Sequence, residues 1–124
     1  MNKKSVALGN CFQNGFKYLF SSKGNEDMLL VHGTVSGQKH IEGIRYEHCW
    51  VEYCEQHIVD SQIVNLWMVV DPSQDMEKPV VCPRELYYKI ARVIELNVKK
   101  YSRVDALLFA AKQMHYGNWE DLGE

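Results

Sequence analysis

The chain has 124 residues, of which 46% are hydrophobic and 24% are charged, and its formal net charge is −2. These values are typical of a globular domain, so we expect a single domain over residues 1–124. They argue against nucleic-acid binding, which requires a surplus of Lys and Arg, and no apolar run approaches the ~20 residues of a transmembrane helix.

No signal peptide is visible, because the apolar run after the first lysines is too short. We therefore expect a cytoplasmic protein with no membrane partner, and its cysteines should be reduced thiols. A metal site could draw on these residues: His32, His40, His48, His57, Cys49 and Cys54. No pair among them has a tight zinc spacing and no C-x-x-C pair occurs, so we expect neither a metal ion nor a cofactor.

The first predicted element is a helix that begins near Gly9 and Asn10. Its apolar residues recur at helical spacing, and they are Phe12, Phe16, Leu19 and Phe20. The helix should end before the polar loop at 21–25. This placement puts Cys11 in the first turn of the helix.

Three strands are predicted next, over residues 28–35, 44–53 and 66–71, because these runs are rich in β-branched and aromatic residues. A turn is expected at 36–39. Residues 58–60 are open to two interpretations, a short strand or part of an insertion. Strand alternation places Ile44, Tyr46, His48 and Trp50 on one face.

The C-terminal third alternates between helix and strand. A helix should start at Pro83, a residue favoured in the first turn. Residues 94–98 could form a short strand, and a last helix should run from Ala106 to about Met114, with Ser102 as its N-cap. The order of helices and strands predicts an α+β fold with an antiparallel sheet.

Three residues in this pattern could support nucleophilic chemistry. A thiol at a helix N-terminus is favoured as the thiolate, and a neighbouring imidazole can accept its proton. Cys11 opens the first predicted helix, His48 lies on a strand and Asp71 ends the next one. An acid at that place could orient the imidazole through its other nitrogen. Asp60 is a competing candidate for this third role.

The residues around this triad resemble those of transglutaminase-like cysteine proteins of the papain-like superfamily. The resemblance covers residues 9–12, the H-x-W-x-E pattern of 48–52 and the strand end at 69–73, in the family's order of Cys, His and Asp. Cys49 stands where the family usually has Ala. The chain also resembles small bacteriophage-encoded proteins, through residues 30–33, 41–43 and 116–119 as well as the His48 strand.

The family resemblance implies a papain-like core, with a Cys-bearing helix packed on a small antiparallel sheet and further helices near the C-terminus. It implies a cysteine hydrolase or acyltransferase of peptidase, deamidase or transglutaminase type, acting on a peptide or protein amide through a thioester. The oxyanion would be held by the Cys11 backbone N–H together with Asn10 or Gln13. Trp50 would shield the ion pair from water, and His32 would lie in the substrate groove.

The phage resemblance favours a different kind of function. On the same scaffold, a non-catalytic protein could bind or inhibit a host protein in the host cytoplasm. For His32, the alternative to a place in the substrate groove is a buried histidine with a purely structural role. Catalysis predicts that Cys11 is partly exposed and within hydrogen-bond reach of His48, whereas binding predicts an exposed apolar patch away from the cysteine.

Overall fold

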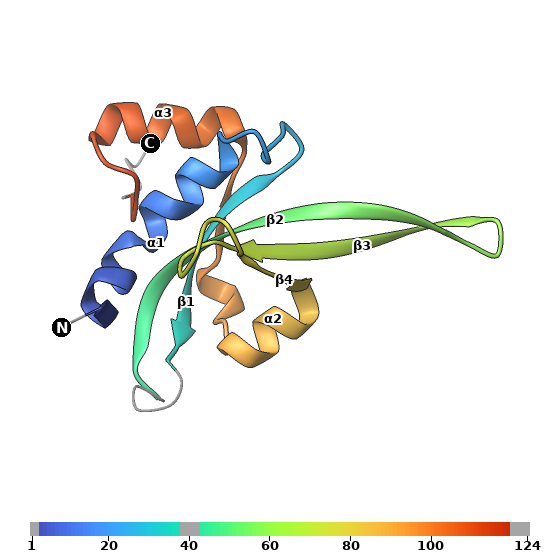
Figure 1. Ribbon diagram of the computed structural model, residues 1–124, viewed down its shortest axis with the longest axis horizontal. Helices are drawn as coiled ribbons and strands as arrows, with labels where there is room; N and C mark the ends of the chain where they lie inside the picture. Colours follow the sequence, from blue (N-terminus) through green and yellow to red (C-terminus); the bar gives the residue numbers. More distant parts are fainter. Residues whose placement is uncertain (1–2, 38–42, 120–124) are drawn as a thin grey trace.

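The computed structural model describes residues 3–37 and 43–119, and these form an α+β fold built on one antiparallel sheet (Figure 1). The predicted α+β class and antiparallel sheet are thereby confirmed. The sheet has five strands in the order β4-β3-β2-β1-β5. In chain order the elements are α1 (Lys3–Leu19), β1 (Leu29–Ser36), β2 (Arg45–Val59), β3 (Gln62–Asp71), β4 (Val80–Pro83), α2 (Arg84–Ala91), the 3₁₀ helix η2 (Glu95–Asn97), β5 (Lys99–Tyr101) and α3 (Arg103–Gln113).

Helices cover both faces of the sheet. Helices α1 and α3 lie on one side and α2 lies on the other (Figure 1). Because side chains alternate along a strand, β2 contributes Cys49 and Val51 to the core under α1 and Trp50 to the core under α2. The sheet therefore has two apolar faces, and a residue's parity along β2 decides which helix it meets.

The outer halves of β2 and β3 form a two-stranded arm that projects from the molecule (Figure 1). β1 pairs with β2 only as far as Glu52, and β4 pairs with β3 only as far as Met68. The segment left open by the sequence, 58–60, belongs to this arm and is not a separate strand. Asp60 and Ser61 have φ values of 52° and 67°, as a two-residue hairpin turn requires.

The predicted start of the first helix is wrong. α1 begins at Lys3, because residues 3–8 include strong helix formers that extend the helix in the N-terminal direction. Cys11 consequently lies in the middle of α1 and not in its first turn. This removes the helix N-terminus as a source of thiol activation.

Two other differences concern the C-terminal third. The strand predicted at 94–98 is wrong, because pairing with β1 begins only at Lys99 and the preceding residues form η2. The short strand β4 was not predicted. The last helix is confirmed, with Ser102 Oγ accepting a hydrogen bond of 3.1 Å from the Asp105 N–H.

Part of the predicted turn at 36–39 lies outside the described residues, as do His40, residues 41–42 of the phage resemblance and the side chains of the first lysines. Within the described residues, no helix is both long enough and apolar enough to span a membrane.

Candidate active site

The antiparallel pairing of β2 and β3 brings His48 and Asp71 together. Val51 lies opposite Val70, so Asp71 comes level with Trp50. His48 precedes Trp50 by two residues on β2, so its side chain lies on the same face of the sheet as those of Trp50 and Asp71. The Nε2 of His48 lies 3.0 Å from Oδ2 of Asp71. Asp60 lies at the tip of the arm, at the other end of β2, so the imidazole partner is Asp71.

Asp71 is held in place by two further hydrogen bonds. The Tyr87 hydroxyl donates to Oδ2 at 2.5 Å, and the Ser73 N–H donates to Oδ1 at 2.9 Å. Burial alone would raise the pKa of Asp71, but the His48 interaction and the hydrogen bonds from Tyr87 and Ser73 lower that pKa to about 2. Asp71 is therefore an ionised acceptor near neutral pH.

Cys11 approaches His48 at the part of β2 that has a neighbouring strand on one side only. β3 ends at Asp71, so the first residues of β2 pair with β1 alone, and α1 packs along this part of β2. Burial lowers the pKa of His48, but the interactions with Asp71 and Cys11 outweigh it and raise that pKa to about 10. All three predicted catalytic residues therefore meet at one place.

The two ring nitrogens of His48 have different surroundings. Nε2 donates to the Asp71 carboxylate, which leaves Nδ1 as the nitrogen able to exchange a proton with Cys11. Nδ1 is buried and has no direct partner with full hydrogen-bonding geometry among the described residues. Catalytic hydrogen bonds are often long or poorly aligned before substrate binds, so these surroundings do not argue against proton transfer from Cys11.

Asn14 connects α1 to the loop that follows Asp71. Its Nδ2 donates to the backbone oxygens of Pro72 and Ser73, both at 3.2 Å. Asn14 follows Cys11 by three positions, so the two side chains share a helix face. This residue was missed by the sequence reasoning, although its i+3 spacing from Cys11 was a usable signal. Tyr87, which binds Asp71, was not among the predicted site residues either.

Two expectations about Cys11 are contradicted. Catalysis predicted partial exposure, but the side chain is 0% exposed. Its backbone N–H lies inside α1, where it is committed to the helix, since only the first four N–H groups of a helix are free. This N–H therefore cannot hold an oxyanion in the present backbone conformation.

The other predicted site residues are divided between several places. Asn10 and Gln13 are half-buried and flank Cys11 on α1, but residues one or two apart on a helix do not share a face. Trp50 is buried, with its ring centroid 6.2 Å from that of His48, so it shields one side of the imidazole.

His32 lies on the α1 side of the sheet, away from Trp50, in an aromatic cluster with Phe12, Tyr101 and Trp119. Both ring nitrogens are buried without a hydrogen-bond partner among the described residues. Burial, helped by the positive charge of Lys99, lowers its pKa to about 3. His32 is therefore a neutral core residue in this structure.

The remaining cysteines differ in their surroundings. Cys49 is buried below α1, and burial together with the charges of Cys11 and Asp71 raises its pKa well above the usual value. Cys54 is exposed and Cys82 is half-buried. No three His, Cys, Asp or Glu side chains converge as a metal site within residues 3–37 and 43–119.

Comparison with known proteins identified no matching family model, no matching curated protein and no matching solved structure.

Proposed function

We propose that the chain is a cysteine-dependent amide hydrolase or acyltransferase with a papain-like or transglutaminase-like core. The observation that carries this proposal is the meeting of Cys11, His48 and Asp71 across three elements, with Asp71 on one nitrogen of the imidazole and Cys11 close to the ring. This is the arrangement by which a base activates a thiol while an acid orients the base. The additional bonds from Tyr87 and Asn14 hold the acid and its loop.

The proposed reaction proceeds in two steps. Cys11 gives its proton to His48, and the thiolate sulfur attacks the amide carbonyl. His48 then donates that proton to the leaving amine, the C–N bond breaks and a thioester with Cys11 remains. Water, or a second amine, attacks the thioester with His48 as base, which releases the acid or the new amide and restores the thiol.

Substrate access requires side chains around Cys11 to move, because the thiol has no exposed surface. The oxyanion donor must come from a side chain and not from the Cys11 N–H. Asn10 and Gln13 lie off the Cys11 face of α1, so one of these amides would have to turn toward the carbonyl when substrate binds.

Trapping of the acyl intermediate tests this proposal. The protein is mixed with p-nitrophenyl acetate, and its intact mass and peptide map are recorded. We expect a burst of p-nitrophenolate and an acetyl group on Cys11 that hydroxylamine removes. Cys11→Ala and His48→Ala should both lack the burst, whereas Cys54→Ser, which alters the exposed thiol, should keep it. Acetylation of Cys54 alone would reject the proposal.

A second candidate function is supported by the arm. Ile58 and Ile63 face each other across its two strands and are 79% and 68% exposed, and Val59, Val64 and Leu66 are also exposed. Exposed apolar patches of this kind mark contact surfaces. A non-catalytic protein that binds a host protein through the arm would keep its effect on bacterial growth after Cys11→Ala and lose it after Ile58→Asp.

A further inference from the structure

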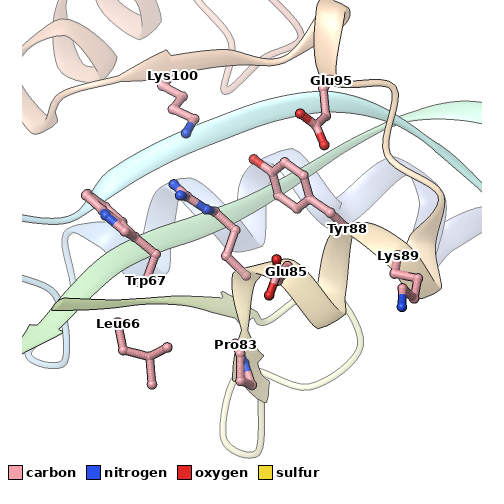
Figure 2. Close-up of a pocket in the computed structure, with 9 residues that line it drawn as sticks. Leu66, Trp67, Pro83, Glu85, Tyr88, Lys89, Glu95 and Lys100 are labelled. Atoms are coloured by element: carbon pink, nitrogen blue, oxygen red, sulfur yellow. The ribbon is translucent and has the colours of Figure 1, made fainter. Parts of the chain in front are cut away.

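A second site lies on the α2 side of the sheet, above Glu52. A pocket of about 640 Å³ opens there between the base of the arm, α2 and β5 (Figure 2). This volume is in the range of small-molecule sites. In Figure 2, Trp67 lies on one side of the pocket and Tyr88 on the other, with Lys100 above them.

Glu52 lies behind this pocket and is bonded to three of the residues that line it. Its side chain is completely buried, and its Oε2 accepts hydrogen bonds from the Trp50 indole N–H at 2.9 Å and from the Tyr88 hydroxyl. Its Oε1 lies 3.1 Å from Lys100 Nζ and 3.5 Å from Arg84 Nη1. Both oxygens of the carboxylate are thus fully occupied.

The two cations share one carboxylate oxygen, which leaves a local surplus of positive charge. Their nitrogens can be no farther apart than the sum of those two distances, 3.1 Å and 3.5 Å. The side chains of Arg84 and Lys100 are 33% and 37% exposed, respectively, and both line the pocket. Each has more N–H donors than its bond to Glu52 uses, and a carboxylate or phosphate can accept from two such donors at once.

Apolar and aromatic surface adjoins this pair of cations. The Arg84 guanidinium lies 4.9 Å from the ring centroid of Trp67, and Leu66 and Pro83 line the same pocket. Glu85, Lys89 and Glu95 also line the pocket, and the charges of these three residues cancel to within one unit. Because Glu85 and Glu95 are acidic, a cationic ligand is the alternative that a binding test must include.

We propose that this pocket binds an anionic group, a carboxylate or a phosphate, attached to an apolar or aromatic body. The anion would bridge Lys100 and Arg84, and the body would pack against Trp67. This proposal does not depend on the Cys11 site, because none of its residues belongs to the triad.

The proposal is tested by NMR titration of the three tryptophan indole N–H signals, with that of Trp67 assigned from Trp67→Phe. The probes are phenylacetate, phenyl phosphate, phenylacetamide and benzylamine. We expect at least one of the two anions to shift the Trp67 signal, and the tighter one identifies the anionic group. Phenylacetamide should bind at least tenfold more weakly, as expected for loss of charge-assisted hydrogen bonds.

Variants and salt locate the anion. Lys100→Gln should weaken binding of the anion about tenfold. Arg103→Gln is the control, because it also removes one positive charge, but from a side chain that stacks on Phe20 and does not line the pocket. It should leave the affinity unchanged. If Lys100→Gln fails to fold, the wild-type affinity for the anion should still fall as salt is raised. Equal binding of phenylacetamide, tighter binding of benzylamine, or no shift of Trp67 with any probe would overturn the assignment.

Discussion

The imidazole of His48 donates from Nε2 to the Asp71 carboxylate at 3.0 Å, so Nδ1 is the nitrogen left for Cys11. This relationship depends on strand register, because a shift of one residue would turn one of the two side chains to the other face of the sheet. The fold thus sets the geometry of the pair before any substrate is present.

The ion pair predicts how stability depends on pH. The pKa of His48 is raised from 6.5 to about 10, so its contribution is complete below pH 6.5 and is lost as pH rises through 10. The pKa of Asp71 is lowered from 3.8 to about 2, so its contribution is present above pH 3.8 and is lost as pH falls through 2. We expect the pair's contribution to be largest between about pH 4 and 6.5.

Urea denaturation of the wild type and of His48→Gln at several pH values measures this contribution. The difference in unfolding free energy between the two proteins should shrink steadily from pH 6.5 to 10. A difference that stays constant over this range would show that the folded pKa of His48 is not raised.

Tyr87→Phe removes one hydrogen bond to the Asp71 carboxylate and little volume. Hydrogen bonds to charged groups contribute about 1.5–3 kcal/mol, so we expect a loss of unfolding free energy in that range. Tyr88→Phe is a matched control on the same helix, since it removes a hydroxyl from Glu52. Both should be destabilised, but only Tyr87→Phe should change the pH dependence of Cys11 alkylation.

Gly15 provides a test of the packing of α1 on β2. A methyl group added there would lie 2.6 Å from the sulfur of Cys49. Gly15→Ala should therefore destabilise the protein by about 1–3 kcal/mol, although Ala is the better helix former by about 1 kcal/mol. The double variant with Cys49→Ala should recover most of the loss, and a double-mutant cycle with no coupling would contradict this packing.

His32→Phe tests the assignment of His32 to the core. A buried ring nitrogen without a partner costs about 1–3 kcal/mol, and Phe would place a ring of similar size in the same aromatic cluster. We expect thermal denaturation to show unchanged or higher stability, and Cys11 alkylation to be unaffected. Loss of Cys11 reactivity in His32→Phe would show that His32 contributes to the active site.

Much of the fold was predictable from local patterns. The strand alternation of Tyr46, His48 and Trp50, and the Ser102 cap of α3, follow from side-chain periodicity and local hydrogen bonding. The start of α1 was missed because Gly9 and Asn10 look like a helix boundary, whereas the stretch before them has enough helix propensity to continue.

The site was predictable in its members but not in its setting. Residue types and order suggested Cys11, His48 and Asp71, and the register of β2 with β3 excludes Asp60. The burial of Cys11 depends on tertiary packing that no local pattern specifies. The same is true of the Glu52 pocket, whose cations come from α2 and β5.

The most direct test of the central claim is the alkylation of Cys11 by iodoacetamide as a function of pH, with Cys54 in the same molecules as the reference. Peptide mass spectrometry separates the two rates, and the reference corrects for the reagent. Burial slows Cys11 at every pH, so the informative quantity is how the ratio of the two rates changes with pH.

If a thiolate–imidazolium pair exists, the rate ratio of Cys11 to Cys54 should rise about tenfold for each pH unit below neutrality, because only the ordinary thiol loses its thiolate. His48→Ala should abolish this rise, and Cys82→Ser should leave it unchanged. A ratio that does not vary with pH in the wild type, or that is the same in His48→Ala, would contradict the proposed catalytic triad.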